Sequence, residues 1–129
     1  MDMTKRIAYL NMISEKIIGC AIEVHKALGP GLLESYYEKS LCREFEIRNI
    51  VYENQAMVPI VYKHTFLGDY KLDILVENEI IVELKVVEKL GALFEAQLLT
   101  YLKLTKKKVG LLLNFNVPIL KDGIRRIIN

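Results

Sequence analysis

The strongest constraint on the fold is a hydrophobic alternation in residues 72–85, LDILVENEIIVELK. Apolar side chains occupy every second position in both halves of this segment: Leu72, Ile74 and Val76, then Ile80, Val82 and Leu84. In paired strands these two apolar faces coincide only when Val76 lies opposite Ile80. That register requires a three-residue turn over residues 77–79, in which Asn78 tolerates a left-handed backbone. We therefore predict an antiparallel hairpin that pairs Ile74 with Val82 and Leu72 with Leu84.

The same register places Asp73 directly opposite Glu83, with Lys85 on the same face of the sheet. Like charges facing each other across a ladder destabilise a sheet, and partial burial increases the cost. A divalent cation removes this conflict, because Mg²⁺ binds a few carboxylate oxygens and retains several waters. The alternative is an ordinary salt bridge between Lys85 and either acid on a solvent-facing sheet. The hairpin alone favours neither interpretation.

The remaining periodicities indicate one mixed α/β domain over residues 1–129. Apolar residues at helical spacing predict helices over 11–28, 31–48 and 91–105. Segments rich in β-branched and aromatic residues predict strands over 50–63 and 66–76, with a turn near His64 and Thr65. Further strands are predicted over 80–87 and 108–117, followed by a terminal strand or short helix. The expected order is α-α-β-β-β-α-β plus this terminal piece.

The segment Gly29-Pro30-Gly31 separates the first two predicted helices. A glycine followed by a proline is a common helix end, and proline also suits the first position of a new helix. We therefore expect a helix-to-helix corner that places Glu34 in the first turn of the second helix, where the helix dipole favours a carboxylate.

Composition limits the choice of partner and compartment only weakly. The chain of 129 residues is 52% hydrophobic, carries a net charge of +2, and has no apolar run long enough for a membrane span. No signal peptide is recognisable at the N-terminus, so we expect a cytoplasmic protein without a membrane partner. We accordingly expect Cys20 and Cys42 to be buried thiols and not a disulfide. A homo-oligomer is compatible with the sequence.

Positive charge is concentrated late in the chain. The residues concerned are Lys103, Lys106, Lys107, Lys108, Arg125 and Arg126. Lysines in the last turn of a helix complement its dipole, so a solvated helix end is one interpretation. Contact with phosphate groups is the other. The two histidines lack partners at ligand spacing, and we expect His25 to be packed and His64 to lie in a turn.

Three motifs in this chain resemble those of a known group of nucleases. Asp73 followed by Glu83-Leu84-Lys85 resembles the D-(x)n-E-x-K signature of the PD-(D/E)XK nuclease superfamily, although Lys71-Leu72 precedes Asp73 without the proline of that signature. Residues 31–37, GLLESYY, fit G-x-x-E-x-x-Y, the pattern of the GxxExxY family within it. Gln97 and Tyr101 add a Q-x-x-x-Y similar to the exonuclease branch. The resemblance covers roughly residues 11 to 118.

This resemblance implies a restriction-endonuclease-like sheet and a Mg²⁺- or Mn²⁺-dependent nuclease acting on DNA or RNA. It implies that Asp73, Glu83 and the backbone carbonyl of Leu84 hold the metal. Lys85 would position the attacking water, and Glu34 would support a second metal or that water. A nuclease-fold protein that binds nucleic acid or a protein partner without cleavage is the alternative, and a purely structural module is a third.

The implied supporting residues also have simpler interpretations. Tyr37 would lean over the same cleft or belong to the core. Gln97 and Tyr101, four residues apart and hence on one helical face, would contact a phosphate or position Lys85, or form a plain surface pair. Glu34 itself would otherwise be a helix-capping glutamate.

Overall fold

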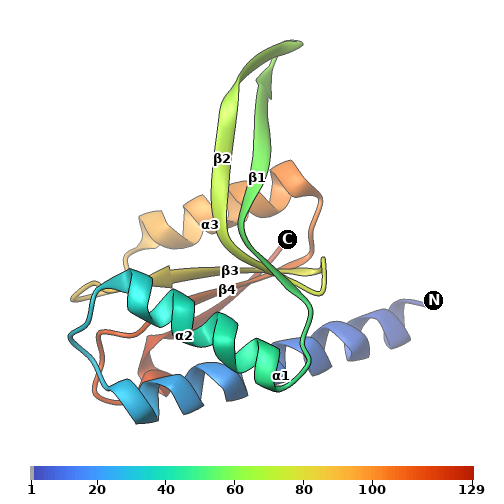
Figure 1. Ribbon diagram of the computed structural model, residues 1–129. Helices are drawn as coiled ribbons and strands as arrows, with labels where there is room; N and C mark the ends of the chain where they lie inside the picture. The colour runs from blue at the N-terminus through green and yellow to red at the C-terminus, as the bar shows by residue number, and fades with distance from the viewer. Residues whose placement is uncertain (1) are drawn as a thin grey trace.

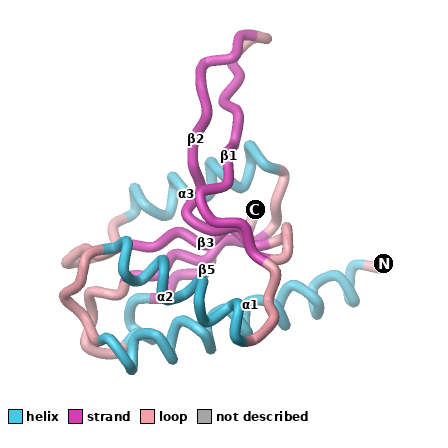
Figure 2. Tube along the Cα trace, in the orientation of Figure 1, coloured by secondary structure: helices cyan, strands magenta, loops and turns pink. Residues whose placement is uncertain are grey.

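The computed structural model describes residues 2–129 and contains three α-helices, one short 3₁₀-helix and five strands (Figures 1 and 2). The helices are α1 (Met3–Leu28), α2 (Glu34–Ile47) and α3 (Ala92–Thr105), with the 3₁₀-helix η1 at Leu120–Gly123. The strands are β1 (Tyr52–Tyr62), β2 (Thr65–Val76), β3 (Ile80–Lys85), β4 (Val109–Asn114) and β5 (Ile124–Ile128). This order matches the predicted one, and the terminal piece is a strand.

The five strands form one mixed sheet in the order β1-β2-β3-β4-β5. Only β3 and β4 are parallel, and α3 connects them as the crossover that a parallel pair requires. Helices α1 and α2 lie on one face of the sheet and α3 lies on the other (Figure 1). The predicted sheet flanked by helices is therefore confirmed.

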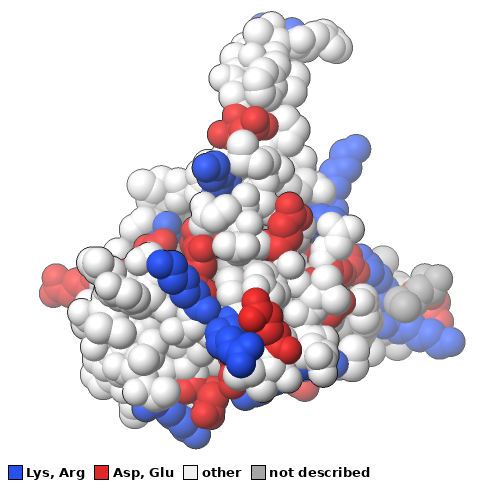
Figure 3. Space-filling view, in the orientation of Figure 1, with Lys and Arg blue, Asp and Glu red and all other residues white. Residues whose placement is uncertain are grey.

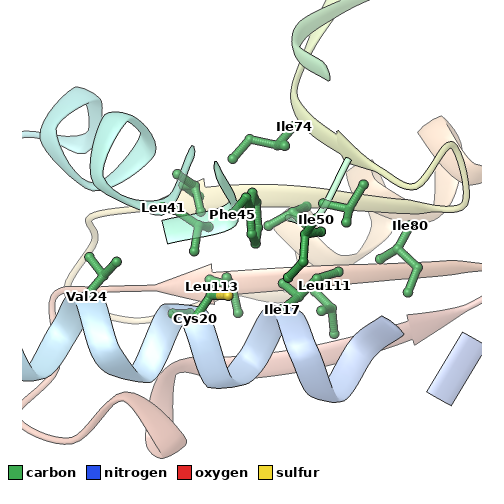
Figure 4. Close-up of a cluster of buried hydrophobic side chains, with 14 of the residues drawn as sticks. Ile17, Cys20, Val24, Leu41, Phe45, Ile50, Ile74, Ile80, Leu111 and Leu113 are labelled. Atoms are coloured by element: carbon green, nitrogen blue, oxygen red, sulfur yellow. The ribbon is translucent and has the colours of Figure 1, made fainter. Parts of the chain in front are cut away.

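Two apolar clusters hold these layers together. The larger packs α1 and α2 against the sheet, with Ile17, Phe45 and Leu111 fully buried (Figure 4). The smaller lies beneath α3 and includes Leu98. Gly110 of β4 permits this close approach, because a Cβ at that position would lie 2.9 Å from the side chain of Leu98. As a result α3 lies close to β4, on the sheet face to which Ile81 of β3 also contributes.

The register of the central hairpin follows the predicted alternation as far as Ile74. Val76 lies opposite Ile80 and Ile74 opposite Val82, and Glu77 and Asn78 in the turn have positive φ. The predicted pairing of Leu72 with Leu84 is wrong, because the ladder ends at Ile74 and β2 then leaves β3. Leu72 instead belongs to the cluster under α3.

The departure of β2 coincides with an irregularity in its other neighbour, β1. Regular pairing continues on both sides of Gln55 and Asp73, but these two residues do not pair with each other. Gln55 has a φ of 55°, which is unusual for a residue within a strand. The register is the same on both sides of this break, so no residue is inserted, and β1 and β2 are both strongly bent where they leave the sheet (Figure 1). The strands beyond this bend, residues 56–72, form a two-stranded arm whose base packs against α3 and whose tip projects away from the helices (Figures 1 and 2).

The arm ends in a tight turn formed by Lys63 and His64, which both have positive φ. Thr65 already belongs to β2, so His64 is the turn residue that the sequence predicted. The other histidine, His25, is buried, with its Nε2 atom 2.8 Å from the carbonyl oxygen of Val117, which confirms the expected packing.

Both N-terminal helices begin at residues other than those predicted. Helix α1 begins at Met3 and not near residue 11, since the side chain of Asp2 accepts a hydrogen bond from the N–H of Lys5 at 2.8 Å and caps a longer helix. Helix α2 begins at Glu34 and not at Gly31, whose φ is 101°. Pro30 therefore lies in the corner and not at the first helical position.

Cys20 and Cys42 are buried free thiols, as predicted. Burial raises the pKa of the Cys42 thiol to about 11. Among the residues described, no helix is long and apolar enough to cross a membrane.

Candidate active site

The candidate site lies where β2 leaves β3. Beyond this point the backbone groups at that edge of β3 no longer pair with a strand and can bind side chains instead. The backbone N–H of Leu84 donates to Oδ2 of Asp73 at 2.8 Å, so a carboxylate replaces the missing strand backbone. The carbonyl of Lys85 accepts from the N–H of Phe115 on the β4 side at 3.0 Å. Successive residues of a strand direct their backbone groups to opposite edges. The carbonyl of Leu84 consequently points to the edge that β2 has left, the side of Asp73.

Glu83 is an acid buried next to this edge. It alternates with Leu84 and faces α3, and only 3% of the residue is exposed. Its Oε1 atom is buried without a hydrogen-bond partner. Burial raises the pKa of Glu83 strongly, and the neighbouring charge of Asp73 raises it further. The two acids are thus held together at a cost. They are not the directly opposite ladder pair that the sequence predicted, because the pairing of β2 with β3 ends at Ile74 and Val82.

Lys85 shares the α3-facing side of β3 with Glu83. Its Nζ atom lies 4.9 Å from the ring centroid of Phe94 in the first turn of α3, a cation–π contact. Within residues 2–129 it forms no salt bridge with Asp73 or Glu83. The ordinary salt bridge that the sequence left open is therefore not formed.

Glu34 is the first residue of α2, which lies on the sheet face opposite to α3, and it is exposed. Partial burial of its carboxylate raises its pKa, the charge of Asp73 raises it further and Lys85 lowers it. Its carboxylate makes no hydrogen bond within the described part of the chain, and the N-cap of α2 is Leu33. The Glu34 carboxylate therefore interacts electrostatically with Asp73 and Lys85 and does not cap its helix.

Besides Glu34, Asp73 and Glu83, a fourth acid lies near the site, Glu38, which the sequence did not predict. It accepts a hydrogen bond from Nε2 of Gln55 at 2.9 Å, which ties α2 to the irregular position of β1. Burial raises the pKa of Glu38, and the charge of Asp73 adds to this. The available signal was its position four residues after Glu34, on the same helical face.

Tyr37 lies in the core, the second of its two predicted positions. Its ring is fully buried and stacks on Phe115 with centroids 4.6 Å apart. Its hydroxyl donates to the carbonyl of Gly29 at 2.6 Å and accepts from the N–H of Leu32 at 3.1 Å. Tyr37 thus fixes the corner from which α2 and Glu34 begin.

On α3, the predicted pair of Gln97 and Tyr101 is divided. Tyr101 is buried and stacks on Tyr70 of the arm, with centroids 4.1 Å apart. Burial raises the pKa of Tyr101, as do the charges of Glu83 and Asp73. Gln97 is exposed and makes no hydrogen bond within residues 2–129.

Two aromatic residues beside the site were also missed. Phe94, which contacts Lys85, precedes Gln97 by three residues and shares its helical face. Tyr70 gave no signal, because its contact with Tyr101 depends on the bend in β2.

The chemistry of these groups fits a divalent cation with few protein ligands. Within residues 2–129, no group of three or more His, Cys, Asp or Glu side chains is arranged to hold a metal. Mg²⁺ does not require such a cage, since one or two carboxylates plus waters suffice. Asp73, Glu83 and the carbonyl of Leu84 offer this donor set. The unpartnered oxygen of Glu83 is the atom that a cation would satisfy.

Comparison with known proteins gives one match. The family model described as the PD-(D/E)XK nuclease superfamily matches residues 11–127. Searches of curated proteins and of solved structures found no match to the chain.

Proposed function

Because the chain belongs to the PD-(D/E)XK nuclease superfamily, we propose that it is a Mg²⁺- or Mn²⁺-dependent nuclease that hydrolyses phosphodiester bonds of DNA or RNA. The observation that carries this proposal is the buried Glu83, whose carboxyl group lies beside Asp73 and has one oxygen without a partner in the described chain. A structural module gains nothing from a buried carboxyl group placed beside a second acid.

In this proposal Asp73, Glu83 and the carbonyl of Leu84 hold the metal. When bound, the metal supplies Lewis-acid polarisation of a phosphoryl oxygen and lowers the pKa of a coordinated water. Lys85 orients the attacking water and stabilises negative charge that develops on the phosphoryl oxygens. Its contact with Phe94 directs the ammonium without neutralising it. Glu34 accepts a hydrogen bond from the same water or supports a second metal.

We further infer that the chain is a member of the GxxExxY branch and forms one domain over residues 1–129 that acts in the cytoplasm. Support for the branch comes from the roles of two of its three motif residues. Glu34 approaches Asp73 and Lys85, and Tyr37 holds the corner that precedes Glu34. The glutamate and the tyrosine of the motif thus both act at the N-terminal end of α2.

The proposal is tested by a cleavage assay on single- and double-stranded DNA and RNA with Mg²⁺, Mn²⁺ or EDTA. Parallel calorimetric titrations with Mn²⁺ compare wild type, Asp73→Ala and Glu15→Gln, which removes an exposed acid on α1 and serves as control. We expect wild type and Glu15→Gln to bind Mn²⁺ and to cleave only when metal is present. Asp73→Ala should neither bind Mn²⁺ nor cleave. Strand binding without cleavage by any sample would favour the non-catalytic alternative.

A further inference from the structure

A cavity of about 630 Å³ lies at the end of the sheet opposite to Glu83 and Lys85. Both β3 and β4 begin at this end, and the N-terminal part of α1 closes one side of the cavity. Apolar side chains contribute much of its lining, among them Ile7, Val109 and Ile128. The cavity is therefore separate from the candidate active site, at the opposite end of β3.

Cationic side chains form the rim of this cavity. They are Arg6, Lys106, Lys107, Lys108 and Arg126, against a single acid, Glu79. The lining thus carries a surplus of four positive charges, whereas the whole chain carries a net charge of +2. The rest of the molecule is consequently net negative, and the cavity is its main concentration of positive charge. Figure 3 shows blue side chains gathered at this end, at the right of the view.

Most of these charges have no acidic partner. Arg6 pairs with Glu79, and the ammonium of Lys107 donates to the carbonyl of Asn78 at 2.8 Å. The side chains of Lys106 and Lys108 make no hydrogen bond or ion pair within residues 2–129. Like charges gathered in a partly enclosed space attract anions, because low-dielectric walls focus their field.

The end of α3 holds three consecutive lysines at this rim. Lys106 has a φ of 58°, a left-handed conformation that ends the helix. The N–H of Lys107 donates to the carbonyl of Leu102 at 3.0 Å and stabilises this turn. The lysine cluster is thus part of a defined turn and not only a solvated helix end.

We propose that this cavity binds a nucleotide, with its phosphate against the cationic rim and its base against the apolar lining. The cavity volume falls within the range of small-molecule sites. The inference rests on the proposed function for the source of the nucleotide, which is the strand to be cut. The acids of the active site repel a polyanion, so a cationic anchor at the other end of the sheet retains the strand near them.

The distance between the two sites determines the length of strand that reaches both. The six residues of β3 separate them by about 17 Å, at roughly 3.3 Å per residue. The cavity adjoins α1, whereas Glu83 and Lys85 face α3, so a strand that reaches both sites must also pass around the sheet. A free nucleotide therefore occupies the cavity alone, and only a strand longer than this separation also reaches the active site.

The test measures binding of a labelled single-stranded oligonucleotide by fluorescence anisotropy over a series of salt concentrations. EDTA is present so that no cleavage occurs. The variant Lys106→Gln/Lys108→Gln removes the two unpaired charges, and Lys16→Gln/Lys121→Gln removes two exposed lysines elsewhere as control. We expect the cavity variant to lose about tenfold or more in affinity. Its slope of log affinity against log salt should fall by about 1.4, since each phosphate contact contributes roughly 0.7 for single strands.

Competition with ATP then identifies the source of the nucleotide. Failure of ATP to displace the strand assigns the cavity to nucleic acid, and displacement that depends on Lys106 and Lys108 assigns it to free nucleotides. Three results would overturn the inference. They are an unchanged affinity of the cavity variant, an equal loss of affinity in the cavity and control variants, and no binding of either the oligonucleotide or ATP to wild type. Failure of the proposed function is distinguishable, because it appears as absent cleavage with metal while this binding persists.

Discussion

Oδ2 of Asp73 accepts a hydrogen bond from the backbone N–H of Leu84 at 2.8 Å, at the point where β2 leaves the sheet. This contact gives Asp73 a structural role in addition to its proposed metal binding, and the two roles are separable by substitution. Asparagine retains an oxygen acceptor for Leu84 and removes the charge that faces Glu83. Alanine removes both.

We expect Asp73→Asn to leave the metal-free protein as stable as wild type, or more stable by up to about 1 kcal/mol. Asp73→Ala should lose about 1–3 kcal/mol, because a partly buried N–H is left without a partner. Urea denaturation in EDTA measures both free energies of unfolding. If the two variants lose the same amount, repulsion between the acids is not the dominant effect. Added Mn²⁺ should stabilise wild type, and it should stabilise both variants much less than wild type.

Glu83 should make the stability of the metal-free protein depend on pH. In the unfolded chain its pKa is near 4.5, and burial beside Asp73 raises it in the folded state. As pH rises above about 4.5 the unfolded chain releases this proton before the folded protein does, so wild type loses stability. Glu83→Gln removes this loss.

The stability gained by Glu83→Gln over wild type should therefore be small near pH 4 and grow by up to roughly 1.4 kcal/mol per pH unit above about 4.5. Denaturation in EDTA across this range, with the exposed Glu88→Gln as control, tests the sign. A gap between wild type and variant that stays constant with pH would contradict it.

Some features of this site were predictable from the sequence and others were not. Strict alternation on both sides of Asn78 determined the register from Ile74 to Val82, because only one pairing joins the two apolar faces. The bend beyond Ile74 was not predictable, since it depends on Leu72 packing under α3 and on the unusual backbone of Gln55. Both are contacts between segments distant in the sequence.

The same distinction explains the N-terminal helices. The Gly29-Pro30-Gly31 break was evident locally, whereas the start of α2 depends on the hydroxyl of Tyr37, which reaches back to Gly29 and Leu32. Among the residues missed at the site, Glu38 and Phe94 share helical faces with predicted residues, and Tyr70 reaches Tyr101 only through the bend.

Tyr37→Phe tests the role of this hydroxyl. The substitution leaves the N–H of Leu32 and the carbonyl of Gly29 without their partner, so we expect a loss of about 1–3 kcal/mol in the free energy of unfolding. Tyr36→Phe is the matched control, because Tyr36 is exposed and makes no side-chain hydrogen bond within residues 2–129. Equal stability of the two variants would show that the corner does not need Tyr37.

The distal arm should contribute little to the stability of the fold. Its side chains near the tip, including Val61, Tyr62 and Phe66, are more than half exposed. Replacing residues 60–68 by Asn-Gly joins the paired residues Pro59 and Asp69 through a two-residue hairpin turn.

We expect this truncation to change the free energy of unfolding by less than about 1 kcal/mol. Leu72→Ala at the base of the arm should instead cost about 2–5 kcal/mol, because it empties a buried position under α3. A truncation that costs as much as Leu72→Ala would show that the arm is part of the folded core.

The most direct test of the account is Lys85→Met, with cleavage rate and Mn²⁺ affinity measured on the same protein. A protonated lysine has no lone pair to offer a metal, so its proposed role lies in the chemical step. Methionine keeps an aliphatic side chain against Phe94 and removes the charge. We predict Mn²⁺ affinity close to that of wild type and cleavage slower by about 100-fold or more, the scale for losing one positioned electrostatic group. A variant that cleaves as fast as wild type would contradict this account of the site.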